Sequence, residues 1–139
     1  PVAACVRHPI DRAISLYHFF RIHQWPSHEA QHRLIQSKAL AADLSTFWET
    51  LEIARTARNL RHFKTQSEFL RGAPVVHLLR FENLAEDFRR LAIHLGCPEI
   101  QLPHINAALR DSRALTPAAE ARIRSFYAED FDQWYPETS

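Results

Sequence analysis

Residues 2–15, VAACVRHPIDRAIS, contain the change of hydrophobic pattern on which the fold prediction depends. Val2–Val6 is a short continuous apolar run, typical of a strand buried in a parallel sheet. Beyond Arg7, the ring of Pro9 suits the first turn of a helix, where its missing N–H costs nothing. Apolar side chains then recur with helical spacing as far as Phe20. We therefore predict a strand that passes into an amphipathic helix, with a fixed positive charge at the junction.

A second strand followed by a helix is predicted later in the chain. VVHLLR, residues 75–80, forms an apolar run, and residues 83–96 have a helical stripe that ends at Gly96 in the C′ position. This order of elements indicates an α/β fold. Two strands do not make a stable sheet of this kind, so we expect further strands before Pro1. Other helices are predicted at residues 27–40, at 46–54 with Thr46 and Glu49 as a capping box, at 64–70, and from Pro117 onward with Thr116 as N-cap.

Composition limits the classes of protein that need to be considered. The chain has 139 residues, a formal net charge of +1 and no methionine. The length suits one domain, and the charge gives no reason to expect nucleic-acid binding. No apolar run approaches the ~20 residues of a membrane span. We expect residues 1–139 to be the C-terminal, larger part of a single domain. Cys5 and Cys97 lack metal or redox spacing, and we predict that Cys5 is a buried thiol.

Arg7 and Ser15 are the first candidates for a binding site. The C-terminal end of a parallel strand faces the crevice in which α/β folds bind ligands. Ser15 follows Arg7 by eight residues, about two turns into the predicted helix, and can point back toward that crevice. An arginine fork with a hydroxyl makes a compact site for one phosphate group. In the alternative interpretation Arg7 pairs with a carboxylate and Ser15 only packs.

Four segments resemble one enzyme family. VRHPIDRAISLYHFF, residues 6–20, is similar to the 3′-phosphate-binding segment of sulfotransferases that use 3′-phosphoadenosine-5′-phosphosulfate (PAPS), and Arg7, Pro9, Arg12 and Ser15 occupy matching positions. Three later segments resemble carbohydrate-type sulfotransferases in the same order: HFKTQSEFL (62–70), LLRFENLAEDFRRLAIHLG (78–96) and LTPAAEARIRSFYAEDFDQWY (115–135). Residues 22–57 carry little of this resemblance.

The resemblance implies both a fold and a reaction. The fold would be a three-layer, P-loop-NTPase-like parallel sheet with helices on both faces, here incomplete at the N-terminus. The reaction would be metal-independent, in-line transfer of a sulfuryl group from PAPS to a hydroxyl, expected to be that of a carbohydrate. Arg7 and Ser15 would bind the donor's 3′-phosphate, and His62 is the candidate general base. Arg12 would support the site or be structural, and Gln66 would orient a substrate or cap a helix.

One family segment is missing from the sequence. The resemblance requires a loop, roughly P-K-x-G-T-T-S, whose backbone N–H groups and lysine hold the 5′-phosphosulfate. Gly72 and Gly96 are the only glycines, and neither lies in such a loop. We expect the loop upstream of Pro1; the alternative is a non-catalytic relative that kept the scaffold. A cytoplasmic, bacterial location is favoured, with the Golgi lumen as the alternative for an animal protein. The sequence does not specify the acceptor or the oligomeric state.

A weaker alternative is a zinc hydrolase. SHEAQH, residues 27–32, contains H-E-x-x-H, which on a helix places His28 and His32 on one face with Glu29 as base and Glu52 as a distant third ligand. The segment is polar, whereas such zinc-binding helices are usually buried, and no G-x-x-H continuation follows. We therefore rank zinc below the donor-nucleotide site.

Other side chains have two open interpretations each. Tyr17, Trp25 and Trp48 would stack on a sugar or adenine ring, or belong to the core. Glu82 would pair with Arg80 or Arg7, or act as a helix N-terminal carboxylate. Asp130 near the C-terminus is expected to be structural.

Overall fold

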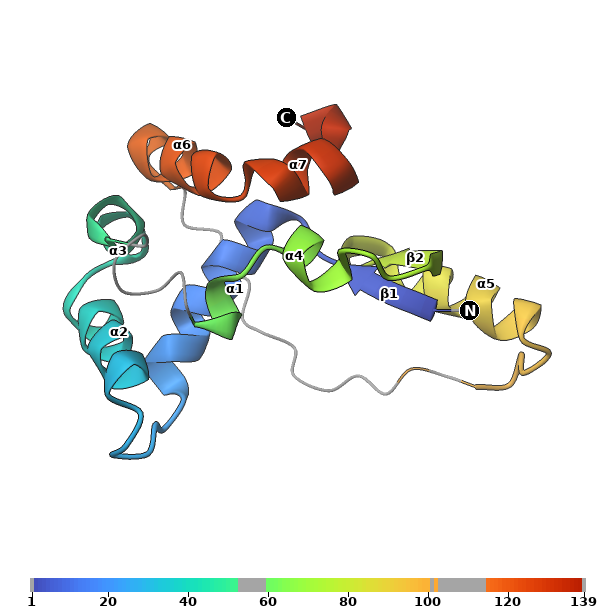
Figure 1. Ribbon diagram of the computed structural model, residues 1–139, viewed down its shortest axis with the longest axis horizontal. Helices are drawn as coiled ribbons and strands as arrows, with labels where there is room; N and C mark the ends of the chain where they lie inside the picture. The colour runs from blue at the N-terminus through green and yellow to red at the C-terminus, as the bar shows by residue number, and fades with distance from the viewer. Residues whose placement is uncertain (1, 53–59, 101, 103–114, 139) are drawn as a thin grey trace.

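The first strand, the first helix and the second strand lie where the sequence predicts them. The computed structural model describes residues 2–52, 60–100, 102 and 115–138 (Figure 1). Strand β1 (Val2–Val6) leads into helix α1 (Pro9–Ile22), and β1 pairs in parallel with β2 (Val75–Arg80). In this register Ala4 lies opposite Leu78. The predicted α/β class is therefore confirmed, with a sheet of two strands within the described residues.

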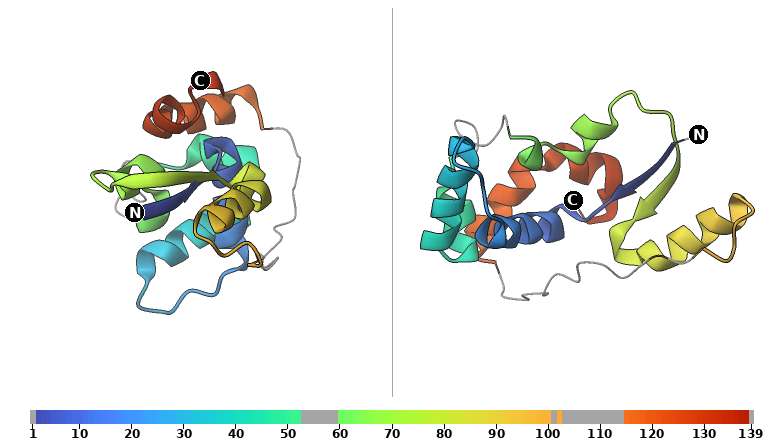
Figure 2. Two further views of the ribbon diagram at one scale, coloured as in Figure 1. Left: turned by 90° about the vertical axis from the view of Figure 1, so that its right-hand side faces the viewer. Right: turned by 90° about the horizontal axis from the view of Figure 1, so that it is seen from below.

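The helices gather mainly at one end of the molecule. Helices α1, α2, α3 and α6 lie together at that end, while the sheet and α5 form the other end (Figures 1 and 2). In the part of the chain that the structure describes, no helix has the length and apolar character needed to cross a membrane. The bounds are α2 Ala30–Ala41, α3 Leu44–Thr50, α4 Gln66–Leu70, α5 Leu84–His94, α6 Pro117–Phe126 and α7 Ala128–Trp134, with 3₁₀ turns η2 Arg61–Phe63, η3 Phe81–Asn83 and η4 Pro136–Thr138.

The hydrophobic core surrounds α1 in the helical end. Tyr17, Phe20 and Trp48 are buried there, and the rings of Tyr17 and Phe47 lie 5.3 Å apart. The hydroxyl of Tyr17 donates to the carbonyl of Ala42 at 2.8 Å, so its polar atom is satisfied inside the core. Tyr17 and Trp48 therefore belong to the core, which is the second of the two roles predicted for them; the first was stacking on a sugar or adenine ring.

Two predicted helix ends are confirmed by their hydrogen bonds. The hydroxyl of Thr116 accepts from the N–H of Ala119 at 3.2 Å and caps α6. Gly96 has φ +74° after the end of α5, and the N–H of Cys97 returns to the carbonyl of Ala92 at 2.8 Å. This is a Schellman motif, which needs the left-handed conformation that glycine adopts without steric cost.

The predicted start of α3 is wrong. Asp43, not Thr46, is the N-cap, and its carboxylate accepts from the N–H of Thr46 at 2.8 Å. Glu49 does not return to form a capping box; its carboxylate accepts a hydrogen bond from the hydroxyl of Thr116, the N-cap of α6. Asp and Thr are both good N-cap residues, so residue type alone does not distinguish Asp43 from Thr46 as the cap. The predicted end is also wrong: α3 ends at Thr50 with Leu51 as the C-cap, so the helix does not continue through Leu51, and Ala54 lies outside the described residues.

The prediction that Cys5 is buried is also wrong. Ala4 and Val6 are buried, whereas Ala3 and Cys5 are exposed. Successive side chains of a strand point to opposite faces, so this alternation means that one face of β1 is covered and the other is open among the described residues. The continuous apolar sequence had predicted a strand covered on both faces.

Candidate functional site

Arg7 lies just past the end of β1, between the last strand pair and α1. The Cζ atom of its guanidinium stands 4.5 Å from the ring centre of Phe81, and its Nε is buried. Across the described ranges, no carboxylate or carbonyl accepts a hydrogen bond from this guanidinium. The ion pair proposed as the alternative role of Arg7 is therefore not formed with any described residue. The guanidinium of Arg7 is stacked on the Phe81 ring, and its buried Nε–H has no hydrogen-bond partner among the described residues. Such a group can donate a hydrogen bond to the oxygen of an anionic ligand.

The backbone of Arg7 is held by the side chain of Gln66. Its N–H donates to Gln66 Oε1 at 2.7 Å, and its carbonyl accepts from Gln66 Nε2 at 2.8 Å. Gln66 does not cap a helix as one of its two expected roles required, because Thr65 caps α4 in a capping box with Glu68. Its other expected role, orienting a substrate, stays a prediction. Arg7 and Gln66 are 59 positions apart, and no local sequence pattern indicates that they are in contact. Sequence reasoning therefore missed this pair.

Asp130 lies behind Gln66 and is fully buried. Its carboxylate accepts from the backbone N–H groups of Gln66 at 2.9 Å and Ser67 at 2.8 Å, and from the Ser67 hydroxyl at 2.9 Å. The indole N–H of Trp134 donates to the same hydroxyl at 2.9 Å. Asp130 is structural, as predicted, because it joins α7 to the N-terminal end of α4.

Glu82 holds the residue that follows Arg7. Its Oε1 accepts from the N–H of His8 at 2.6 Å, and its Oε2 accepts from the hydroxyl of Tyr135 at 2.9 Å. The predicted ion pairs of Glu82 are not the contacts found, since Arg80 pairs with Glu137 at 2.6 Å. Burial, and then the hydrogen bond to Glu82, raise the pKa of Tyr135 far above its ordinary value. The tyrosine therefore stays a donor throughout the physiological pH range.

Ser15 is half-buried in the second turn of α1. Its hydroxyl has no hydrogen-bond partner among the side chains and backbone groups that the structure describes. Arg7 and Ser15 thus both keep polar groups uncommitted to the described protein, on either side of the first turn of α1. The predicted phosphate site requires such free donors, because both side chains must donate hydrogen bonds to the phosphate oxygens.

Arg12 has a structural role. Its Nη2 donates to the carbonyls of His62 at 3.2 Å and Lys64 at 2.7 Å, and its guanidinium lies 5.2 Å from the ring of Tyr127. These contacts connect α1 with η2 and with the C-terminal end of α6. Of the two roles expected for Arg12, supporting the binding site or holding the fold together, these contacts fit the second.

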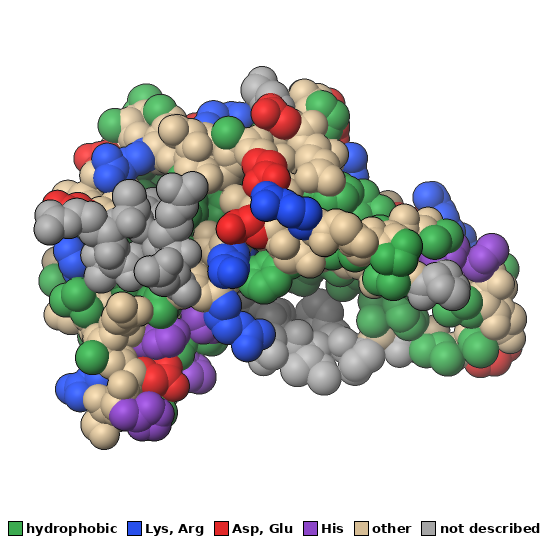
Figure 3. All heavy atoms as spheres, in the orientation of Figure 1, with side chains coloured by type: hydrophobic (Ala, Val, Ile, Leu, Met, Phe, Trp, Pro, Cys, Tyr) green, Lys and Arg blue, Asp and Glu red, His purple; other side chains and the backbone are tan. Residues whose placement is uncertain are grey.

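His62 packs within a cluster of aromatic and histidine rings. Its ring lies 5.4 Å from Phe19, 5.6 Å from Trp25 and 5.4 Å from His32. Burial, followed by the nearby charges of His32 and Arg61, lowers the pKa of His62. Figure 3 shows histidine side chains gathered on the face near α2. The lowered pKa favours the neutral imidazole of His62, the form that accepts a proton.

The helical H-E-x-x-H interpretation is wrong. The N–H of Glu29 bonds to the carbonyl of Pro26 at 3.0 Å, which closes a turn, and α2 begins only at Ala30. His28 therefore precedes the helix and does not share a face with His32, which instead contacts Glu29 at 2.9 Å. No group of three or more His, Cys, Asp or Glu side chains suited to a metal occurs in the described residues.

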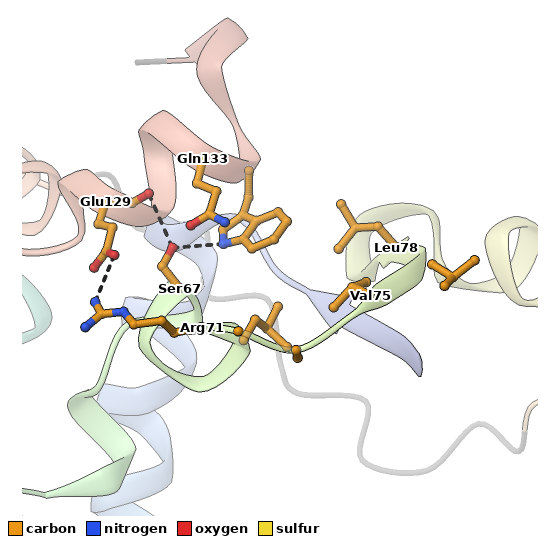
Figure 4. Close-up of a pocket in the computed structure, with 11 residues that line it drawn as sticks. Ser67, Arg71, Val75, Leu78, Glu129 and Gln133 are labelled. Atoms are coloured by element: carbon orange, nitrogen blue, oxygen red, sulfur yellow. Dashed lines mark hydrogen bonds and ion pairs between the residues drawn. The ribbon is translucent and has the colours of Figure 1, made fainter. Parts of the chain in front are cut away.

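A cavity of about 440 Å³ lies between α4, the start of β2 and α7 (Figure 4). Ser67, Arg71 and Trp134 are among its lining residues, and Arg71 forms an ion pair with Glu129 at 3.1 Å. Arg7, Ser15 and His62 do not line it. The cavity is therefore separate from the residues predicted to bind the donor, although Ser67 also belongs to the Asp130 network.

Comparison with known proteins identifies the family. No curated protein and no solved structure matches the chain. Residues 2–105 match the family described as Sulfotransferase domain. This match includes β1, α1, β2 and α5, and with them Arg7, Ser15 and His62. The chain therefore belongs to the sulfotransferase domain family, enzymes with a P-loop-like fold that transfer a sulfuryl group from PAPS.

Proposed function

We propose that Arg7 and Ser15 bind the 3′-phosphate of PAPS. The observation that carries this proposal is the buried, unpartnered Nε of Arg7 at the C-terminal end of a parallel strand. A phosphate oxygen would satisfy this N–H through a charge-assisted hydrogen bond, and the Ser15 hydroxyl would donate to another oxygen. The residues present thus fit the phosphate end of the donor.

We further propose that the acceptor is a hydroxyl group of a carbohydrate. The support is the resemblance of residues 62–70, 78–96 and 115–135 to carbohydrate-type sulfotransferases, in the same order along the chain. The family match gives the donor and the reaction but does not identify an acceptor. The carbohydrate proposal therefore depends on these three segments.

The proposed chemistry assigns a proton acceptor to this chain. When bound, PAPS supplies an activated sulfuryl group: the acceptor oxygen bonds to sulfur as the bond from sulfur to the 5′-phosphate oxygen breaks, and 3′-phosphoadenosine-5′-phosphate (PAP) leaves. The acceptor hydroxyl must lose its proton in this step. We propose His62 as the base, because its lowered pKa favours the unprotonated imidazole, the form that can accept this proton.

Measuring PAP affinity tests the proposed phosphate site. Arg7→Ala in the full-length protein should weaken PAP binding about 50-fold, because a hydrogen bond to a charged group contributes about 1.5–3 kcal/mol. Arg89→Ala, on the exposed side of α5, removes the same charge and should leave the affinity unchanged. Titration calorimetry gives both values. An Arg7→Ala protein that is folded and binds PAP as tightly as the parent would refute the assignment.

A further inference from the structure

A single side-chain amide binds both backbone polar groups of Arg7, and we propose from this that Gln66 is a positioning residue for recognition of the donor 3′-phosphate. Gln66 would act through Arg7, by fixing the peptide from which the guanidinium extends. This inference rests on the proposed role of Arg7 and adds to it a second residue from a distant segment.

The position of Arg7 explains why such a partner is needed. The β1–β2 ladder ends with Val6 opposite Arg80, so Arg7 is the first residue beyond it. The amide of Gln66 offers one donor and one acceptor group in one plane, as a neighbouring strand would. Its contacts of 2.7 and 2.8 Å fix both the place and the tilt of the Arg7 peptide. An arginine on a fixed peptide loses less freedom when it binds an anion.

Gln66 is itself held in one orientation. Its backbone N–H donates to the buried carboxylate of Asp130 at 2.9 Å, and its Nε2 lies 3.5 Å from the same carboxylate. Nε2 therefore faces two acceptors, the Asp130 carboxylate and the Arg7 carbonyl. Rotating the amide by half a turn would bring Oε1 against both acceptors and Nε2 against the N–H of Arg7. The network thus permits one amide orientation, the one that bonds Arg7.

The test compares ligands with and without a 3′-phosphate. Gln66→Met in the full-length protein removes both hydrogen bonds while keeping a side chain of similar length, and Gln66→Ala is the second variant. Each should weaken PAP binding about tenfold, since two hydrogen bonds to Arg7 are lost. Binding of adenosine 5′-monophosphate, which lacks the 3′-phosphate, should not change. Glu68→Ala is the matched control, because it removes the capping box of the same helix without touching the Gln66 amide.

A double-mutant cycle with Arg7→Ala separates positioning from general support of the fold. If Gln66 acts through Arg7, Gln66→Met should have no further effect on PAP affinity in the Arg7→Ala background. An equal loss in both backgrounds, or an equal loss for adenosine 5′-monophosphate, would overturn the positioning role. So would a folded Gln66→Met protein with parental PAP affinity, provided that Arg7→Ala still weakens binding. If Arg7→Ala has no effect, it is the proposed phosphate site that fails.

Discussion

Glu82 and Tyr135 are joined by a hydrogen bond of 2.9 Å although they are 53 positions apart in the chain. The other oxygen of the same carboxylate accepts from the N–H of His8 at 2.6 Å. One carboxylate therefore connects the C-terminal end of the described chain to the residue that follows Arg7. Tyr135 lies beyond the family match, which ends at residue 105, yet through Glu82 it helps to fix the junction between β1 and α1.

Removing the Tyr135 hydroxyl should destabilise the protein modestly. Tyr135→Phe keeps the ring and loses its hydrogen bond to Glu82, so we expect the free energy of unfolding to fall by about 1 kcal/mol. Urea denaturation measures the change. Glu137→Gln, at an exposed ion pair in the same region, serves as control and should change stability by less than about 0.5 kcal/mol. Equal stability of Tyr135→Phe and the parent would contradict a contribution from this bond.

Asp130 should matter much more. Asp130→Ala leaves the N–H groups of Gln66 and Ser67 without their buried acceptor, and we expect a loss of about 3 kcal/mol in the free energy of unfolding. Asp132→Ala on the same helix is the control, because Asp132 is exposed; its effect should stay within about 0.5 kcal/mol. The two substitutions are chemically identical and differ in burial and partners. Similar denaturation curves for both would show that the Asp130 network adds little stability.

His62 should make stability depend on pH. Burial, together with the charges of His32, Arg61 and His23, lowers its pKa in the folded state, while Glu29 opposes the shift. The unfolded chain then binds a proton more readily as the pH falls below about 6.5, so folding loses stability from there down through the folded pKa. The contribution is fully present above about pH 6.5.

The pH effect can be measured by comparing melting temperatures at about pH 7.5 and about pH 5, on either side of the ordinary histidine pKa. We expect His62→Phe to reduce the difference between the two, because phenylalanine suits the aromatic surroundings and does not titrate. His28→Gln, at an exposed histidine outside the cluster, is the control. An undiminished pH dependence in His62→Phe would assign the effect to other groups.

Most elements could be predicted because their signals are local. The apolar run before Arg7, the proline after it, the glycine that ends α5 and the threonine that caps α6 all act within about one helical turn of the residues they affect. The structure places the corresponding boundaries within a residue or two of the predicted ones. The prediction for the start of α3 was wrong because the local signal is ambiguous there. Asp43 and Thr46 are both good N-cap residues, and only their contacts in the structure distinguish them.

Contacts between distant segments could not be predicted in this way. Nothing local in the sequence indicates that Gln66 would bond the Arg7 peptide or that Glu82 would bond His8. The exposure of Cys5 depends on what covers the sheet, which is equally non-local. Arg7, Ser15 and His62 were selected by spacing and by family resemblance, and their roles stay predictions.

The parallel pairing of β1 with β2 also bears on how the chain folds. All the residues of α1 to α4 lie between the two strands, so the ladder cannot form until a long stretch of chain has been brought back on itself. The entropy of closing that loop is lost before any ladder bond is gained. Helices α1 to α3, whose mutual contacts are closer in sequence, can associate earlier. We therefore expect the arginine at the end of β1 to reach its final position late, when the sheet closes on an already compact helical end.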